Sequence, residues 1–404
     1  MNSSEPGRLP YPPVEPYASG HLEVDEPHRL YWETSGNPQG VPVVFLHGGP
    51  GGGTLPAHRR FFDPAHYRVI LFDQRGAGRS LPKAEIGANT TAHLIADMER
   101  LREFLEVEQW LLFGGSWGAT LALAYGQAHP QRCLGFILRG IFLGTAREIR
   151  WFVHDMRAVH PEAWRDFSEF LPQEERADLL AGYRNRLNSE DPEVHLPAAR
   201  AWARYEARAS TLLPNPELVR GMEREPLALA RLEAHYMAHA LFLEEGQLLR
   251  GMDAIRQLPA ILVQGRYDMV CPMAAADELA RAWPEAYYEV VPDAGHSAFE
   301  PGILRALGGA VEAFKQLLPL TAESPQEQPP KPKRPRRSAP KSQPGAKPSA
   351  EGKAAHPGSA PAGAENRTTP ETGKSRRRGS RGSKKKPKEV DVKTNQSTQQ
   401  EQEL

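Results

Sequence analysis

Cysteine is scarce in this sequence, and its scarcity excludes a secreted protein held together by disulfides. Only two cysteines, Cys133 and Cys271, occur among 404 residues. Two cysteines do not make a disulfide framework, and so low a content fits a reducing compartment. We therefore expect a cytoplasmic protein.

Long apolar runs are also missing. No uninterrupted apolar stretch reaches about 18 residues, the length that a membrane-spanning helix needs, so we expect no membrane span. Residues 1–20 are rich in proline and lack the basic start and apolar core of a signal peptide.

Aromatic residues are absent from residues 321–404, which carry 19 Lys or Arg, 9 Asp or Glu and 12 Pro. A segment of this composition cannot bury enough apolar surface to offset the entropy of ordering, so we expect it to be disordered. The other 320 residues carry 31 Lys or Arg and 41 Asp or Glu. The formal net charge of zero therefore combines an acidic body of about −10 with a basic tail of about +10.

The basic clusters of this tail, 331–341 and 374–388, suit weak and salt-sensitive contact with nucleic acid or another polyanion. Base-selective recognition is not expected, because the tail has no aromatic side chain on which bases could stack. A solubilising tail that lies against the acidic body explains the composition equally well.

Within the body, short apolar runs alternate with segments of helical spacing. Residues 21–34 suggest antiparallel strands around a turn at 25–28. The later strands are expected at 41–46, 68–72, 110–113, 134–138, 260–264 and 287–291, and the helices at 91–105, 119–129, 274–283 and 303–317. Strands that alternate with helices imply right-handed crossovers and a mainly parallel sheet covered on both faces.

The segment between the fourth and fifth of those later strands has a different composition. Residues 148–245 are rich in Arg, Glu, Ala, Leu and Trp at helical spacing, which predicts an all-helical insertion that caps the strand ends. The expected organisation is therefore a first core part (1–146), a helical cap (147–250), a second core part (251–320) and the basic, Pro-rich tail (321–404).

One apolar run ends in a Gly-rich turn that contains a serine. Gly114-Gly115-Ser116-Trp117-Gly118 matches the G-x-S-x-G nucleophile elbow, in which the residues two positions away on either side of the serine must lack a Cβ atom. The elbow places Ser116 at a helix N-terminus, where free backbone N–H groups stabilise negative charge.

Two further Gly-rich loops follow strands. The loop at 47–53, His-Gly-Gly-Pro-Gly-Gly-Gly, stands where serine hydrolases of the α/β type supply an oxyanion donor, here Gly49. A phosphate-binding loop or a plain turn is the alternative, although no Lys-Ser or Lys-Thr follows to favour a nucleotide. The loop at 73–80 is expected to be a structural buttress.

A serine needs a base, and the base needs an orienting acid. His296 is the only histidine after Ser116 in a loop directly following a late strand. Asp268 and Asp293 are both candidates for the acid. Asp268 is preferred, because successive strand ends converge on one crevice of a parallel sheet.

The set of Ser116, Asp268 and His296 predicts acyl transfer on an α/β-hydrolase fold. The backbone N–H groups of Trp117 and Gly49 would receive the oxyanion, and loss of one such donor costs on the order of 3 kcal/mol in barrier height. We predict no metal and no cofactor.

The same motifs resemble one family. The loops at 47–53 and 73–80, the elbow at 114–118, Gly265-Arg266-Tyr267-Asp268 and Ala294-Gly295-His296 together are similar to the prolyl aminopeptidases, or proline iminopeptidases. These α/β hydrolases release N-terminal proline from peptides. The resemblance spans roughly residues 10–318 and implies the same activity and peptide substrates here.

The resemblance extends into the expected cap. Trp202-Ala203-Arg204-Tyr205-Glu206 and Leu232-Glu233-Ala234-His235-Tyr236 are similar to the family segments whose glutamates meet the substrate amine, which implies this role for Glu206 and Glu233. Carboxylates that pair with a buried pyrrolidinium offset the cost of its desolvation. Without the family, each glutamate reads as a solvated helix residue. Tyr205 stands where many members carry Trp, which changes the size of the pocket wall.

Three further residues are candidates for contact with the substrate. Phe142 suits a wall for the pyrrolidine ring, with ordinary core packing as the alternative, and Arg139 is placed to orient a cap glutamate. Cys271 follows Asp268 by three residues and should lie near the site without being the nucleophile. A bulky thiol reagent is therefore expected to inhibit.

The predicted function is that of a metal-independent serine exopeptidase specific for N-terminal proline. An esterase or amidase with the same triad is the alternative among enzymes, and it would have no use for Glu206 and Glu233. A polyanion-binding protein that acts through its tail is the alternative from another class, and it would not require the triad.

Overall fold

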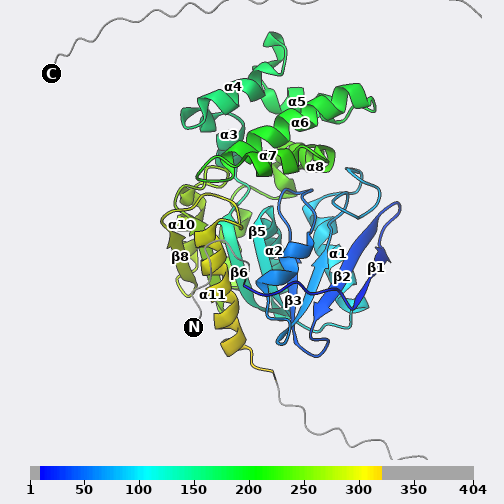
Figure 1. Cartoon of the computed structure of the whole chain (residues 1–404), viewed down its shortest axis with the longest axis vertical. Coiled ribbons are helices and arrows are strands. Elements are labelled where there is room, and N and C mark those ends of the chain that lie inside the picture. The colour runs from blue at the N-terminus through cyan, green and yellow to red at the C-terminus, as the bar shows by residue number, and fades with distance from the viewer. Residues whose placement is uncertain (1–9, 321–404) are drawn as a thin grey trace, which may run out of the picture. The chain divides into compact units, whose positions relative to one another are not determined.

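One sheet of eight strands organises residues 10–320, the part of the chain that the computed structural model describes (Figure 1). Its order is β1-β2-β4-β3-β5-β6-β7-β8. The strands are β1 (Ala18–Glu23), β2 (Arg29–Gly36), β3 (Val41–Leu46), β4 (Tyr67–Phe72), β5 (Trp110–Ser116), β6 (Cys133–Ile141), β7 (Ala260–Gly265) and β8 (Tyr287–Val291). β1 and β2 form the predicted antiparallel pair, β2 is antiparallel to β4, and every other pairing is parallel.

Helices connect these strands. They are α1 (Thr91–Phe104), α2 (Trp117–Ala128), α3 (Ala146–Val153), α4 (Pro161–Glu169), α5 (Leu179–Leu187), α6 (Pro192–Ala209), α7 (Pro216–Met222), α8 (Pro226–Ala238), α9 (Gln247–Arg250), α10 (Met273–Ala282) and α11 (Pro301–Leu317). Short 3-10 helices occur at η1 (Pro56–Phe61), η2 (Pro130–Arg132), η3 (Asp155–Ala158), η4 (Gln173–Glu175), η5 (Ala240–Phe242) and η6 (Met252–Ala254).

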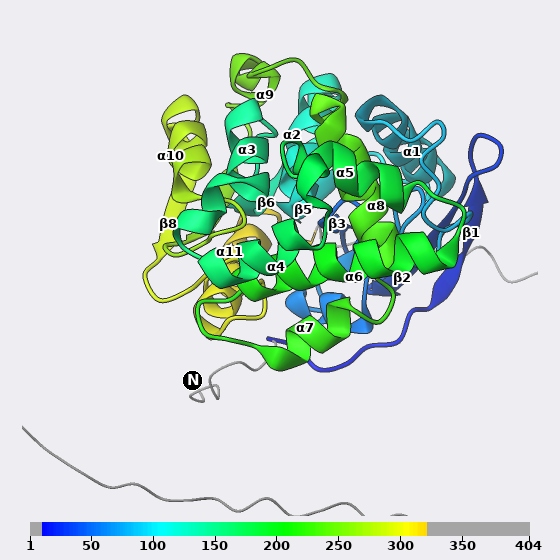
Figure 2. The ribbon, with the colours of Figure 1, turned by 90° about the horizontal axis from the view of Figure 1, so that it is seen from above.

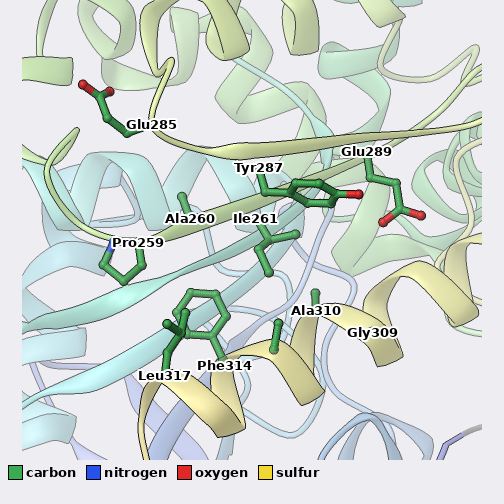
Figure 3. Close-up of a pocket in the computed structure, with 11 residues that line it drawn as sticks. Pro259, Ala260, Ile261, Glu285, Tyr287, Glu289, Gly309, Ala310, Phe314 and Leu317 are labelled. Atoms are coloured by element: carbon green, nitrogen blue, oxygen red, sulfur yellow. The ribbon is translucent and has the colours of Figure 1, made fainter.

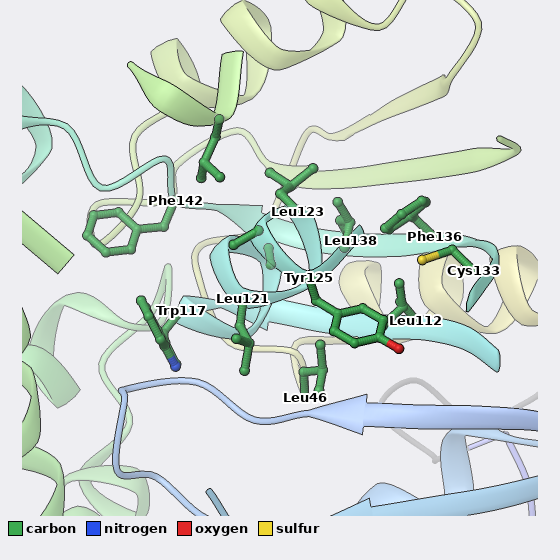
Figure 4. Close-up of a cluster of buried hydrophobic side chains, with 14 of the residues drawn as sticks. Leu46, Leu112, Trp117, Leu121, Leu123, Tyr125, Cys133, Phe136, Leu138 and Phe142 are labelled. Atoms are coloured by element: carbon green, nitrogen blue, oxygen red, sulfur yellow. The ribbon is translucent and has the colours of Figure 1, made fainter. Parts of the chain in front are cut away.

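Side chains of the central strands alternate between two hydrophobic clusters, as a sheet buried on both faces requires. In β3, Val44 and Leu46 belong to the cluster that α1, α2 and α10 cover, whereas Val43 and Phe45 belong to the cluster that α11 covers. Figure 4 shows the first of these clusters, where α2 packs on β5 and β6. The prediction of a mainly parallel sheet with helices on both faces is confirmed.

The segment between β6 and β7 contains helices α3 to α9 and, within the described residues, no strand. Several of these helices pass over one end of the sheet when the body is seen from above (Figure 2). They have a core of their own, in which the ring of Phe167 stacks on Tyr183 and on Tyr205 with 4.3 Å between ring centroids in each case. We call this segment the cap; its limits at 147 and 250 stay a prediction.

Proline stands at the start of four of the seven cap helices α3 to α9. Pro161, Pro192, Pro216 and Pro226 each stand at the start of a helix. Proline fits there because its fixed φ angle is already helical and the first turn leaves its N–H without a partner in any case. The starts of α6 and α8 thereby fix the register at which Glu206 and Glu233 follow.

Membrane-spanning helices and the basic tail were both considered in the sequence. Among residues 10–320, no helix is both long and apolar enough to cross a membrane. The predicted basic tail, residues 321–404, lies outside the described residues.

Candidate active site

Ser116 lies at the sharp turn between β5 and α2. Its backbone has φ +59° and ψ −129°, a conformation that L-residues rarely adopt. A Cβ atom on Gly114 would lie 2.3 Å from the carbonyl oxygen of Gly118, and one on Gly118 would lie 2.0 Å from that of Leu46. Both flanking glycines are therefore required for steric reasons, as the elbow pattern predicts.

The Gly-rich loop after β3 packs directly against the serine. A Cβ atom on Gly48 would lie 3.4 Å from the Cβ atom of Ser116, and Gly49 has φ +106°. The N–H of Gly52 donates to the carbonyl of Gly48 at 3.1 Å, which folds the loop back on itself. The loop thus brings backbone close to Ser116, and α2 begins at Trp117 with its N-terminal N–H groups at the same place.

Gln74, which sequence reasoning did not single out, connects these two donor segments. Its side-chain oxygen accepts from the Trp117 indole N–H at 2.8 Å, and its side-chain N–H donates to the His47 carbonyl at 3.0 Å. Its backbone N–H donates to Nε2 of His47 at 3.0 Å. Gln74 therefore holds the loop and the first residue of α2 at a fixed separation.

The loop at 73–80 is the structural buttress that was predicted. The buried carboxylate of Asp73 accepts from the backbone N–H of Thr54 at 2.7 Å and from Nε of Arg79 at 2.8 Å. Arg79 also contacts Glu33 at 3.0 Å, and its guanidinium lies 3.7 Å from the ring centroid of Tyr31. These contacts tie the end of β4 to the Gly-rich loop.

His296 and Asp268 meet at the ends of β8 and β7. Nδ1 of His296 lies 2.8 Å from Oδ2 of Asp268. The other carboxylate oxygen accepts from the backbone N–H of Cys271 at 2.7 Å, and Oδ2 also accepts from the side chain of Gln264 at 3.2 Å. The rival acid, Asp293, is exposed, and the carboxylate on Nδ1 of His296 is that of Asp268.

Arg139 contacts the opposite nitrogen of the histidine. Its Nη1 lies 3.2 Å from Nε2 of His296 and donates to the His296 carbonyl at 2.8 Å. A guanidinium only donates, so Nε2 is the acceptor and Nδ1 carries the proton toward Asp268. The lone pair that could take a proton from Ser116 is thus occupied by Arg139, while Oγ of Ser116 lies 3.8 Å from Sγ of Cys271.

Two glutamates from the cap are buried beside this group. Glu206 of α6 is 8% exposed and Glu233 of α8 is 3% exposed, and Oε2 of Glu233 accepts from the Trp202 indole N–H at 2.6 Å. Oε2 of Glu206 is buried and accepts no hydrogen bond from any described residue. These positions differ from those of solvated helix residues.

Burial changes the protonation of this pair. Loss of hydration raises the pKa of Glu206 to about 7. Burial first, and the neighbouring charge of Glu206 second, raise the pKa of Glu233 well above its usual value. The two carboxyl groups are close enough to share a hydrogen bond once one of them is protonated, and a cation entering between them would favour the ionised forms.

The remaining candidates occupy different places. Phe142 is 8% exposed, and Figure 4 shows it at the same end of the core as Trp117. Cys271 is buried beside Ser116, and burial raises the pKa of its thiol. Tyr205 lies in the core of the cap, where its hydroxyl donates to the carbonyl of Phe152 at 2.7 Å.

A cavity of about 250 Å³ opens at Ser116 and His296, and Asp268, Glu233, Trp117, Phe142, Tyr205 and Cys271 are not among the residues that line it. Gly48, Gly49, Ser116, Arg139, Glu206 and His296 line it, together with Leu55, His58, Leu218, Met222 and Phe299. A larger hollow of about 520 Å³ lies between β7, β8 and α11 and is lined by none of the candidate site residues (Figure 3). Among residues 10–320, no three His, Cys, Asp or Glu side chains are grouped so that they could hold a metal ion.

Comparison with known proteins gives consistent matches. A family model described as alpha/beta hydrolase fold matches residues 41–303. A proline iminopeptidase of Arabidopsis thaliana is 52% identical over 316 residues, which cover 77% of this chain and 83% of that protein. One of Xylella fastidiosa strain Temecula1 is 47% identical over 311 residues, covering 76% and 99% respectively. Among solved structures, an esterase of Exiguobacterium antarcticum is similar with a TM-score of 0.51 and 18% identity, covering 74% of this chain and 100% of that one, which supports the fold alone.

Proposed function

The chain belongs to the proline iminopeptidase family of α/β hydrolases, and on that premise we propose that it is a serine exopeptidase that removes N-terminal proline from peptides. The observation that carries the proposal is the burial of Glu206, which lines the same cavity as Ser116, lies beside Glu233 and, among the described residues, has no basic side chain hydrogen-bonded to its Oε2. A secondary ammonium group at the start of a peptide would supply a hydrogen-bond donor and a compensating charge.

Catalysis begins when Arg139 leaves Nε2 of His296. His296 then takes the Ser116 proton as Oγ attacks the prolyl carbonyl, and Asp268 stabilises the imidazolium through Nδ1. The backbone N–H groups of Trp117 and Gly49 receive the oxyanion. His296 returns the proton to the leaving nitrogen, and water hydrolyses the prolyl-enzyme in the second half-reaction.

Specificity for the chain terminus comes from the cap. Glu206 and Glu233 hold the substrate ammonium. The nitrogen of an internal proline is an uncharged amide, so it cannot offset the cost of burying these two carboxylates. Phe142 and Cys271 are the proposed walls for the pyrrolidine ring. Tyr205 does not contact the substrate in this proposal. Its hydrogen bond to Phe152 supports α6, the helix that carries Glu206.

Composition supports two further proposals. The low cysteine content supports a cytoplasmic location. The basic tail supports weak contact with polyanions.

Hydrolysis of proline, alanine and leucine arylamides by the wild type and by Ser116→Ala tests the proposal. The wild type should prefer proline, and the variant should lose at least about 1,000-fold in kcat. Glu206→Gln should raise KM for proline arylamide and leave hydrolysis of a simple acyl ester less affected. Equal rates on the three arylamides would refute the specificity, and an active Ser116→Ala would refute the mechanism.

A further inference from the structure

The wall of the catalytic cavity divides by chemistry. The reacting groups Ser116 and His296 and the ionisable side chains of Arg139 and Glu206 account for one part of the lining. The lining also includes the apolar side chains of Phe45, Leu46, Phe113 and Ala298, and the five residues Leu55, His58, Leu218, Met222 and Phe299. Leu55 and Phe299 are 55% and 40% exposed, so apolar surface faces solvent at the edge of the cavity. We call these five residues the apolar wall.

The position of His296 indicates which part of a peptide this wall meets. In the proposed reaction the N-terminal proline is held by its ammonium group at Glu206, and His296 delivers a proton to the leaving nitrogen. The residue that bears this nitrogen must therefore lie beside His296. Phe299 follows His296 by three residues in the same loop and lines the cavity with Ser297 and Ala298.

His58 contributes an uncharged aromatic surface to this wall. Its ring is stacked between Phe45, at 4.4 Å between centroids, and Phe299, at 5.9 Å. The backbone N–H of Leu55 donates to its Nδ1 at 3.0 Å, and burial lowers the pKa of His58 to about 3. The imidazole is therefore neutral at physiological pH, and its stacked neighbours hold it in place.

We propose that Leu55, His58, Leu218, Met222 and Phe299 form a subsite for the second residue of the peptide and that this subsite favours aliphatic and aromatic side chains over glycine and acidic ones. The inference rests on the proposed function and specifies its leaving group. An acidic side chain would lose hydration against these five uncharged side chains, whereas an apolar side chain would bury surface there.

Amidated dipeptides Pro-Phe, Pro-Leu, Pro-Gly and Pro-Asp provide the test. All four give the same prolyl-enzyme, so the second residue acts on the acylation step and therefore on kcat/KM. The value of kcat/KM should be about 10-fold higher for Pro-Phe and Pro-Leu than for Pro-Gly, and lowest for Pro-Asp.

Variants of the wall sharpen the measurement. Phe299→Ala and Leu55→Ala should each reduce kcat/KM for Pro-Phe several-fold and change that for Pro-Gly little. Leu213→Ala is the matched control, because Leu213 is an exposed cap leucine, 74% accessible, that does not line the cavity. Leu55 is itself more than half exposed, so Leu55→Ala keeps the test valid if Phe299→Ala folds poorly.

The outcomes separate the two proposals. Equal kcat/KM for all four dipeptides, or an equal loss for all four in both wall variants, would overturn the subsite and leave the peptidase activity standing. Absence of hydrolysis of every Pro-X dipeptide would overturn both. A loss confined to the apolar dipeptides, with Leu213→Ala unchanged, is the supporting result.

Discussion

Glu206 is an acid that the fold destabilises in its charged form. Burial raises the pKa of Glu206 to about 7. The folded protein therefore gains most from this group below the ordinary carboxyl pKa near 4.5, where Glu206 is protonated in both the folded and the unfolded state. That contribution is lost as the pH rises through about 7. In the proposed function the ionised pair holds the substrate ammonium group, which offsets this cost when substrate is bound.

Glu206→Gln should therefore stabilise the free protein at pH 8 by on the order of 1–3 kcal/mol and change its stability little at pH 4.5. Urea unfolding at the two pH values measures the difference. Glu162→Gln, which alters an exposed glutamate of α4, is the control and should have little effect at either pH. The same stabilisation by Glu206→Gln at both pH values would show that its carboxyl titrates normally.

Single residues differ in how far the sequence reveals them. Ser116, Asp268 and His296 could be located because each follows a recognisable strand, and the structure brings Asp268 into contact with His296. The sequence could not reveal the roles of Gln74 and Gln264 or the contact of Arg139 with Nε2 of His296. These are hydrogen bonds across the sheet, and they depend on which strands become neighbours. The burial of Glu206 and Glu233 has the same origin, since the packing of the cap, and not the periodicity of each helix, decides which faces of α6 and α8 become buried.

At the scale of elements, the junction of β5 and α2 has little steric tolerance. Gly118 lies in the first turn of α2, where a Cβ atom would lie 2.0 Å from the carbonyl oxygen of Leu46. Gly309 of α11 is also helical, yet nothing lies within 4 Å of the place where its Cβ atom would be. Neither residue has a left-handed backbone, so the two positions differ mainly in steric contact.

Alanine substitution at these two glycines should have opposite effects. Gly309→Ala should stabilise the protein by about 0.5–1 kcal/mol, because alanine has the higher helix propensity. Gly118→Ala should destabilise it by at least about 2 kcal/mol, because β3 or α2 must shift. Thermal unfolding of both variants measures the contrast, and a Gly118→Ala protein as stable as the wild type would contradict the tight approach.

The bounds of β6 explain why the contact between Arg139 and His296 could not be predicted. The strand predicted at 134–138 ends before Arg139, since Gly140 reads as the start of a loop. In the structure β6 continues to Ile141, and Arg139 pairs with Gly115 on one side and Val263 on the other. The strand therefore holds Arg139 beside the elbow, where it meets His296. By contrast, the strands at 41–46 and 287–291 have the predicted bounds, because turn residues flank them on both sides.

At the scale of the whole molecule, charge is divided along the chain. Residues 1–320 carry an excess of 10 acidic residues, and residues 321–404 carry an excess of 10 basic ones. The candidate site lies within the first segment, and the tail lies outside the described residues. The two proposed activities, hydrolysis and polyanion contact, should therefore be separable.

A chain that ends at Leu320 should keep the hydrolysis of proline arylamide and lose retention on a heparin column. Retention of the full chain should fall steeply with salt, because each basic side chain that neutralises an anionic group releases a counterion. Full-length Ser116→Ala is the control and should be retained like the wild type, since its charge is unchanged. If the full and shortened chains elute at the same salt concentration, the acidic body already neutralises the tail, and its role is solubility rather than contact with a polyanion.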